Sequence, residues 1–255
     1  MRRLQLLSGY TRRKFLEWAA FRSFLFTLVV NQAMTPLLGL AVWSSAMPGE
    51  PGVSTYFVAL LAVQLMTVSD EYYSVAIAIY EGSLNDALLR PHPVVIEPLG
   101  ENIANRMWHL LIGLPFIAVT VVVAHAAFSP GNVLVAAPAL IFAAVLRFLF
   151  TYILALSALW TAQAGGVTGF GQTMIFLLGG IAAPVMLLPD HVRSLGAALP
   201  FRSMLGFPAE IASGSLTTAQ ILEGYGWQTL WTVVLALAAA FVWRSGVRRY
   251  TAIGG

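Results

Sequence analysis

The 255-residue sequence has no cysteine, a single lysine and few charges of either sign. Without cysteine the chain can form no disulfide, no thiolate metal site and no cysteine nucleophile. Charged residues make up 10% of the sequence and hydrophobic residues 58%, whereas soluble domains usually carry about 25% charged residues. So few charges cannot cover a water-facing surface, and the composition predicts a protein whose main solvent is lipid. The net charge of +3 is too small and too scattered to indicate nucleic-acid binding.

The sequence also lacks the motifs of common catalytic sites. The phosphate-binding loop G-x-x-x-x-G-K-[ST] needs a lysine, and the single Lys14 follows Arg13 rather than a glycine. No G-x-S-x-G elbow occurs, and no two histidines have the H-x-x-x-H spacing of a zinc site. We therefore expect no catalytic, cofactor or metal site in this chain, and any ATP-driven work would need a separate motor.

What the sequence does contain is six apolar runs long enough to cross a membrane, since a spanning helix needs roughly 20 such residues. Barrel strands would alternate over about ten residues, and these runs do not. The sequence therefore predicts an all-α polytopic membrane protein with six transmembrane helices in one domain, residues 1–255. The runs are Phe21–Trp43, Thr55–Ile79, Met107–Phe128, Val133–Trp160, Gly169–Leu188 and Thr229–Trp243.

Lysine and arginine in the connections predict the orientation of the chain. With six spans, eleven of the 14 basic residues fall on the side of the two termini, Arg90 and Arg106 among them. The opposite side holds Arg193 and Arg202, and Arg147 lies inside the fourth run. We therefore expect a multi-pass inner-membrane protein with both termini in the cytoplasm.

Two segments outside the spans have amphipathic patterns. In residues 1–20, the apolar side chains of Leu4–Ala20 can share one face, which predicts a helix lying in the cytoplasmic interface; a plain basic anchor is the alternative. In the cytoplasmic loop of residues 80–106, Leu84 and Leu88 make one face of a short helix that Pro91 ends. This helix is too short to cross, so its apolar edge must meet the membrane interface or a partner, unless the segment is an ordinary connector.

Few ionisable residues lie within the spans, and His109 and His125 lie in or near the third run. Asp70 and Glu71 interrupt the second run, and Arg147 lies in the fourth. They could line a gate or a polar pathway. A structural bridge from Arg147 to Asp70 or Glu71 is the favoured interpretation, because charges inside a membrane normally pair with one another.

Three short patterns carry a resemblance to a known family. The patterns are Ile79, Gly82, Leu84 and Leu88-Leu89-Arg90-Pro91 in the loop, Leu199-Pro200-Phe201 and Phe207-Pro208-Ala209-Glu210 with Gly214 before the last span, and Tyr250 to Gly255 at the end. Together with the six spans they resemble ABC-2-type transporter permeases, the membrane subunits of type-2 ABC exporters, and more narrowly a bacterial branch whose permeases work in unlike pairs.

The resemblance implies partners and a mechanism. A separate dimeric ABC ATPase would bind ATP and Mg, a second permease of different sequence would complete the membrane part, and lipid would surround both. Alternating access would then move an apolar or amphipathic substrate, such as a lipophilic cation or drug, outward along spans one, two and five.

The resemblance also implies roles for particular segments. The helix Gly82–Arg90 would be a coupling helix in a cleft of the ATPase, Leu4–Ala20 a connecting helix, and residues 189–228 short re-entrant helices on the outer side. The residues implied for ATPase contact are Glu81, Gly82, Leu84, Leu88 and Arg90.

A second hypothesis remains open. The chain could instead be a membrane-embedded enzyme or assembly factor with a site in the outer connection. The residues of such a site would be Asp190, His191, Arg193 and Glu210.

Overall fold

The computed structural model describes residues 2–183, 196 and 198–250. Within these ranges every regular element is a helix, which confirms an all-α polytopic architecture. The helices are α1 (Arg2–Ala19), α2 (Arg22–Ala46), α3 (Pro51–Thr67), a π-helical turn (Tyr72–Ala76), α4 (Ile77–Tyr80), α5 (Leu84–Leu88), α6 (Ile96–Val123), α7 (Pro130–Leu156), a 3-10 turn (Ser157–Leu159), α8 (Ala164–Leu178), α10 (Pro200–Met204), α11 (Gly206–Ser213) and α12 (Thr218–Val247).

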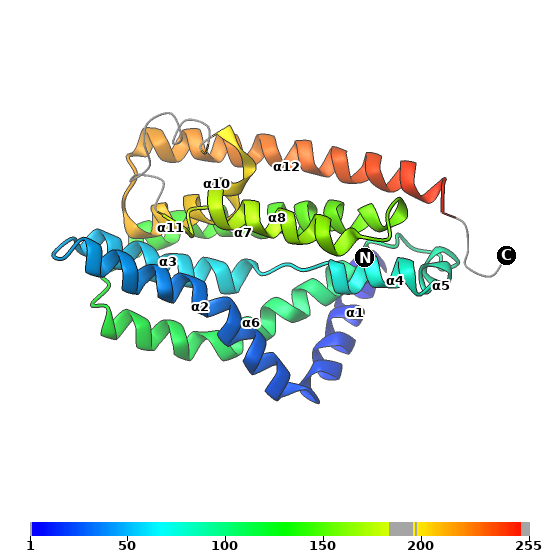
Figure 1. Cartoon of the computed structure of the whole chain (residues 1–255), viewed down its shortest axis with the longest axis horizontal. Coiled ribbons are helices and arrows are strands. Elements are labelled where there is room, and N and C mark those ends of the chain that lie inside the picture. Colours follow the sequence, from blue (N-terminus) through cyan, green and yellow to red (C-terminus); the bar gives the residue numbers. More distant parts are fainter. Residues whose placement is uncertain (1, 184–195, 197, 251–255) are drawn as a thin grey trace.

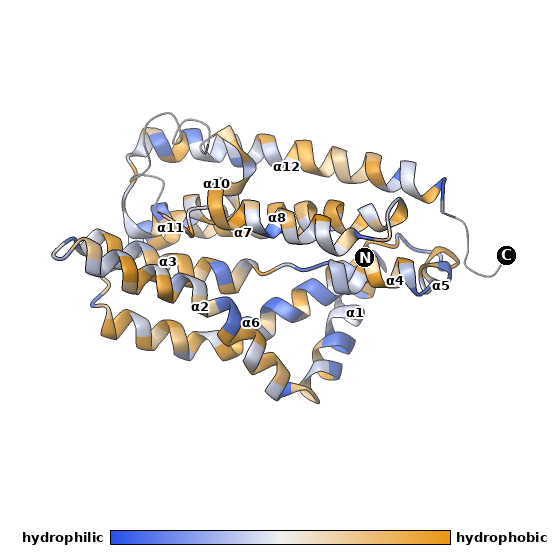
Figure 2. Cartoon of the chain, in the orientation of Figure 1, coloured by the Kyte–Doolittle hydropathy of each residue, from blue (hydrophilic) through white to orange (hydrophobic). Residues whose placement is uncertain are grey.

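Five helical segments in this part of the chain are long and apolar enough to cross a membrane. They run side by side along the long axis of the molecule, and α1 lies across them near one end (Figure 1). The apolar residues follow the long helices, whereas α1 and the α5 region are more polar (Figure 2). The five segments are Arg22–Ala46, Gly52–Tyr80, Ile96–Val123, Pro130–Leu159 and Thr218–Val247.

The sixth expected span is the exception. Its helical part, α8, has 15 residues and a length of about 22 Å, less than the roughly 30 Å of a hydrocarbon core. The expected run Gly169–Leu188 continues into residues 184–188, which lie outside the described residues. Within the described ranges, α8 is therefore too short to cross a bilayer on its own.

Two spans begin earlier than the apolar runs predicted. The third begins at Ile96 rather than Met107, and the last at Thr218 rather than Thr229. Their first turns carry polar residues, which hid them from the hydropathy pattern. Gln228, for example, is buried and donates to the carbonyl oxygens of Ala139 and Ser203 at 3.0 and 2.9 Å. The connection expected over residues 189–228 thus includes α10, α11 and the start of α12.

The second span lies at the centre of the fold. In its most apolar window 72% of the residues are buried, against 33% or less in each of the other four segments, so those four supply most of the outer face. Tyr56, Phe57 and Leu60 of α3 pack in the main core with Leu146 of α7. The short α11 packs against both α3 and α7.

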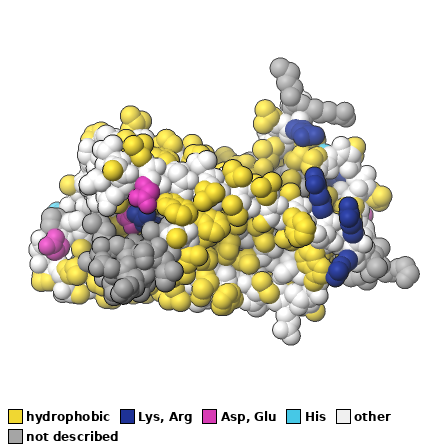
Figure 3. Space-filling view, turned by 90° about the horizontal axis from the view of Figure 1, so that it is seen from above, with side chains coloured by type: hydrophobic (Ala, Val, Ile, Leu, Met, Phe, Trp, Pro, Cys, Tyr) yellow, Lys and Arg dark blue, Asp and Glu magenta, His cyan; other side chains and the backbone are white. Residues whose placement is uncertain are grey.

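Basic residues gather at one end of the bundle. In the space-filling view they cluster at the end where α12 finishes, and the middle of the visible face is apolar with few charges (Figure 3). The start of α1 and the α4–α5 region lie at this same end (Figure 1). One predicted loop cation is misplaced: Arg106 lies inside α6, because the third span begins eleven residues before Met107.

Candidate functional site

The second span is broken in its middle. Helix α3 ends at Thr67, residues 68–71 are not helical, and a π-helical turn at Tyr72–Ala76 leads into α4. The break appears as a thin connection between α3 and α4 near the middle of the molecule (Figure 1). Non-helical backbone is tolerated at membrane depth only where protein or water satisfies its polar groups. The partners of this backbone therefore determine whether the break is stable.

Side chains from two neighbouring helices, α6 and α8, satisfy carbonyl oxygens of the broken segment. Arg106 of α6 donates through Nε to the carbonyl oxygen of Val68 at 3.0 Å and through Nη2 to that of Ala144 at 2.7 Å. Gln172 of α8 donates to the carbonyl oxygen of Ser69 at 3.4 Å. A cation at the carboxyl end of a helix also offsets the partial negative charge of its dipole. Arg106 therefore stabilises the broken end of α3 in two ways.

Arg147 of α7 reaches the last turn of α3 from another side. It is buried, and its Nη1 donates to Gln64 Oε1 and to Thr67 Oγ1, both at 3.1 Å. The Gln64 amide in turn donates to Gln32 Oε1 of α2 at 2.8 Å. A chain of hydrogen bonds thus connects α7, α3 and α2 at the level of the break.

Glu71 follows the break, and its buried carboxylate is surrounded by neutral hydrogen-bond donors. Its carboxylate accepts from Asn102 Nδ2 at 2.6 Å, from Ser69 Oγ at 3.1 Å and from Thr151 Oγ1. The carboxylate also sits at the start of the π-helical turn, where the helix dipole favours negative charge. These bonds account for a buried carboxylate that has no cation in direct contact.

The expected bridge between Arg147 and Asp70 or Glu71 is wrong in its contacts. Among the described residues no ion pair joins them, because Arg147 bonds the end of α3 and Glu71 bonds neutral side chains. The structure does bring Glu71 and Arg147 to the same break, and Asp70 lies exposed beside it. Arg106 and Asn102 were missed because they were taken for loop residues; their spacing of four within one helix was the available signal.

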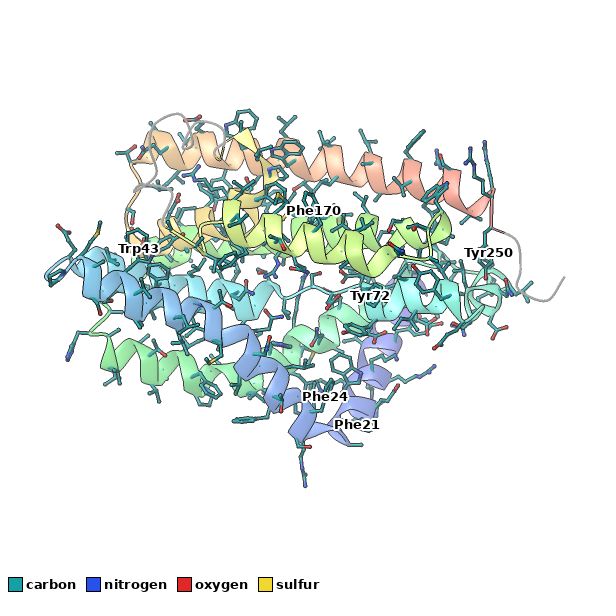
Figure 4. The ribbon with its side chains drawn as sticks, in the orientation of Figure 1. Phe21, Phe24, Trp43, Tyr72, Phe170 and Tyr250 are labelled. Atoms are coloured by element: carbon teal, nitrogen blue, oxygen red, sulfur yellow. The ribbon has the colours of Figure 1, made fainter. Side chains whose placement is uncertain are left out.

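A cavity of about 430 Å³ opens beside the break. It lies between the end of α1, the first half of α2, residues 68–74 and the first half of α6. Phe21 and Phe24 mark its apolar side at the corner where α1 meets α2 (Figure 4). Asp70 and Glu71 line its polar side. The break is therefore bordered by a space large enough for a small organic molecule.

The α4–α5 region forms a foot at the basic end of the molecule, defined here as residues 77–90. Gly82 has a φ of +77°, a conformation that glycine adopts at little cost, and it turns the chain between the two helices. Leu84 is 3% exposed in a core with Ile79 and Ala76, so it anchors the foot rather than facing a partner. Leu88 and Leu89 are 39% and 85% exposed and form its apolar tip.

Arg90 ties the foot to α1 and α6. Its Nη1 donates to Glu97 Oε2 at 2.5 Å and to the Tyr10 hydroxyl at 3.1 Å. The Glu97 carboxylate raises the pKa of Arg90 above its ordinary value, so the guanidinium stays charged. The Tyr10 hydroxyl also bonds His92 Nε2 at 3.1 Å. Two of the residues expected to contact an ATPase, Leu84 and Arg90, are thus engaged within the chain, whereas Glu81 and Leu88 are exposed.

Helix α1 is fixed firmly against α6. Phe15 stacks on Trp108 with ring centroids 4.7 Å apart, and Trp108 Nε1 donates to the Phe15 carbonyl oxygen at 3.1 Å. At Gly100, an added Cβ would come within 2.8 Å of Tyr10 Cβ, so the two helices touch through backbone. The foot, α1 and the wall of the cavity therefore form one connected unit.

The residues of the alternative outer site are only partly described. Asp190, His191 and Arg193 lie outside the described residues, as do residues 251–255 of the terminal pattern. Glu210 is 1% exposed, and its Oε2 accepts from Arg202 Nη2 at 2.5 Å and from Nε at 3.1 Å. Both charges of this pair are thus matched within α10 and α11.

Comparison with known proteins identifies the family of the chain. No curated protein matches the chain. The sequence model of the family described as ABC-2 family transporter protein matches residues 10–254, a range that includes α2 to α12, the foot and the broken span. Since this match covers nearly the whole chain, the protein belongs to the ABC-2 transporter family and is a multi-pass permease subunit that works with an ABC ATPase.

Proposed function

We propose that this permease forms half of the membrane pathway of an ATP-driven exporter in a bacterial inner membrane. A second permease of different sequence completes the pathway, and the partner ATPase binds ATP and Mg. Both termini and the foot face the cytoplasm, α1 lies in the inner membrane interface, and α10 and α11 form the re-entrant segment on the outer side. The gathering of basic residues at the foot end supports this orientation.

The observation that carries the proposal is the exposed apolar tip of the foot. Leu88 and Leu89 project from a five-residue helix whose Leu84 is locked in the core. In water such a pair is unfavourable, and exposed apolar residues on a rigid base are typical of a protein contact. The tip therefore fits an apolar cleft in the ATPase, with Glu81 beside it for polar contact.

Movement at the foot reaches the break by two routes. One route runs through α4 and the π-helical turn to Glu71, because these form one continuous segment. The other runs from Arg90 through Tyr10 to α1, which borders the cavity. Alternating access requires two states with different contacts, and a broken helix can change its angle with less loss of backbone bonds than an intact one.

The proposal is tested by recovering the ATPase with the tagged chain from membranes of its native host. The variant Leu88→Ala/Leu89→Ala should lose at least about tenfold in recovered ATPase, because truncating a contact hot spot commonly costs more than 1 kcal/mol per residue. Its spans should stay folded, since neither side chain belongs to the buried core: Leu88 is 39% and Leu89 85% exposed. The matched control is Leu222→Ala/Leu230→Ala in α12, two leucines that are 69% and 50% exposed.

Two results would contradict the proposal. One is a wild-type chain that never brings down an ATPase when extracted gently. The other is equal recovery by the foot variant and the α12 control, which would place the contact elsewhere.

A further inference from the structure

Residues on the polar side of the cavity beside the break carry buried hydrogen-bond acceptors that have no partner. Among the described residues, the buried side-chain atoms left unbonded include Asn102 Oδ1, Asn105 Oδ1 and His109 Nε2, and all three residues line this cavity. Buried polar atoms in folded proteins nearly always have a partner, so three unpartnered atoms around one cavity call for a ligand or water.

The bonding of the neighbouring atoms makes Asn102 Oδ1 and His109 Nε2 acceptors, and Asn105 Oδ1 is an amide carbonyl oxygen, which can only accept. Asn102 uses its Nδ2 to donate to Glu71 and Ser69, which leaves the carbonyl oxygen Oδ1 free. His109 Nδ1 lies 3.0 Å from the Asn105 carbonyl oxygen, so Nδ1 carries the proton and Nε2 carries a lone pair. His109 is 1% exposed and Asn102 4%, so both are shielded from bulk water.

The charged groups on the wall have the same sign. Asp70, Glu71 and Glu101 line the cavity, and no lysine or arginine does within the described residues. Lys14 Nζ lies 3.7 Å from Glu101 Oε2 and offsets that one charge. Arg106 offsets Glu71 in part, since its Nη2 lies 3.5 Å from Ser69 Oγ, which donates to Glu71. Asp70 accepts a hydrogen bond from the Tyr72 backbone and is attracted by the charge of Arg147, but it forms no ion pair among the described residues, so its carboxylate can still pair with a ligand.

The opposite side of the cavity is apolar and aromatic. Trp18 at the end of α1 and Phe21, Phe24, Leu25 and Leu28 of the α1–α2 corner line it. Phe21 and Phe24 lie at this corner (Figure 4), and both are more than half exposed. Aromatic faces attract cations as well as apolar groups. One wall thus suits an apolar body, and the other suits a positively charged donor.

We propose that this cavity binds an organic ammonium ion that carries at least one N–H group and an apolar or aromatic body. Its N–H groups donate to the Asn102, Asn105 and His109 acceptors, Asp70 neutralises its charge, and its body lies against Trp18 and Phe24. The volume of about 430 Å³ falls in the range of small-molecule sites. That the ammonium ion is the transported substrate rests on the proposed function. That the cavity binds such an ion does not.

The experiment measures binding to the full-length chain alone, in nanodiscs of phosphatidylcholine. Three probes share one aromatic body: pyrenylmethylammonium, its N,N,N-trimethyl derivative and pyrenylmethanol. Energy transfer from tryptophan reports occupancy, since Trp18 lines the cavity. The primary ammonium should bind at least about tenfold more tightly than the trimethylated ion, which has the same charge but no donor, because hydrogen bonds to charged groups are strong. The alcohol should bind more weakly still.

Two variants separate the parts of the site. Asp70→Asn keeps the side-chain shape. It should lower the affinity for the primary ammonium about tenfold and leave the affinity for the alcohol unchanged. Asn105→Leu removes an acceptor that has no partner among the described residues. It should lower the affinity for the primary ammonium but not for the trimethylated ion. Glu223→Gln, an exposed carboxylate at the start of α12, is the matched charge control and should bind like the wild type.

The outcomes are decisive in both directions. Four results would overturn the proposal. The primary ammonium could bind no more tightly than the trimethylated ion, or no more tightly than the alcohol. It could show no saturable binding, or it could bind Asp70→Asn with unchanged affinity. Competition by phosphatidylethanolamine in the nanodisc would support the ammonium site and identify a lipid headgroup as its source; no competition would identify a free ammonium ion. Because no ATPase is present, failure here leaves the exporter proposal intact, and loss of ATPase recovery leaves this site intact.

Discussion

Two buried polar clusters of this permease differ in how completely they are matched. At the α10–α11 end, Arg202 and Glu210 bond each other, Arg202 lies 5.7 Å over the ring of Phe207, and the Tyr56 hydroxyl donates to the Gly180 carbonyl oxygen at 2.9 Å. At the break, the carbonyl oxygens of Val68 and Ser69 have side-chain donors, but three buried acceptors, Asn102 Oδ1, Asn105 Oδ1 and His109 Nε2, are left without partners among the described residues.

This difference indicates that the α10–α11 cluster is structural and that the cluster at the break is suited to binding a ligand. A polar network whose charges are matched rigidifies the elements it joins, whereas a cluster of unmatched groups raises the energy of the empty state. Next to the α10–α11 pair a single neutral acceptor, Gln228 Oε1, has no partner in the described part of the chain. The α10–α11 end therefore has the character of a fixed anchor, and the break that of a site whose partner comes from outside the chain. Substitutions at the two clusters should consequently affect different properties, stability at the first and ligand binding at the second.

The largest effect is expected for Arg202→Ala. It leaves the Glu210 carboxylate, which is 1% exposed, without its cation, and such a loss commonly costs about 3–5 kcal/mol. The variant should show a strongly lowered melting temperature, or no folded protein, in detergent. Asp70→Asn, at the other cluster, should melt like the wild type.

The double variant Arg202→Met/Glu210→Leu is the control, because it removes both charges and keeps apolar volume. It should recover most of the lost stability. A stable Arg202→Ala protein, or an Asp70→Asn protein that melts as early, would contradict the distinction between the two clusters.

A medium effect is expected for Gly224→Ala in α12. A Cβ at this position would overlap the ring of Phe207, which is 1% exposed in α11. Overpacking of this kind typically costs about 1–3 kcal/mol. Gly226→Ala, two residues along the same helix, meets nothing within 4 Å and is the matched control. Thermal unfolding of the two purified variants should separate them; equal melting temperatures would mean that α11 yields and is not a fixed anchor.

The sequence was sufficient for the fold class because the apolar runs are long and charges are rare. It placed five of the six spans on helices that can cross a membrane and predicted the helical character of α1 and α5. It misjudged where α6 and α12 begin, since Glu97, Glu101 and Gln228 look like loop residues until their partners are known. Hydropathy is assigned to each residue by itself. It cannot show that the polar groups of these side chains have hydrogen-bond partners distant in the sequence.

The site was predictable only in part for the same reason. Asp70, Glu71 and Arg147 stood out as charges in apolar runs, and they do meet at one level of the fold. Their partners Asn102, Arg106 and Thr151 did not stand out, because each is ordinary where it occurs in the sequence. Leu84 and Leu88 share a helical face in the pattern, yet only the tertiary contacts of α4 determine that Leu84 is buried and Leu88 is not.

The smallest effect on stability, and the most specific one, is expected for Tyr10→Phe. The change removes one hydroxyl that bonds both Arg90 and His92, which should lower the free energy of unfolding by about 1 kcal/mol or less. Because this hydroxyl joins the foot to α1, the variant should still bind the ATPase but stimulate its ATP hydrolysis severalfold less in proteoliposomes. Tyr225→Phe loses a similar bond, to the Val135 carbonyl oxygen, at the other end of the molecule and should leave stimulation unchanged. If both variants behave alike, the Arg90–Tyr10 contact only stabilises the fold, and the route through α4 and Glu71 alone connects the foot to the cavity.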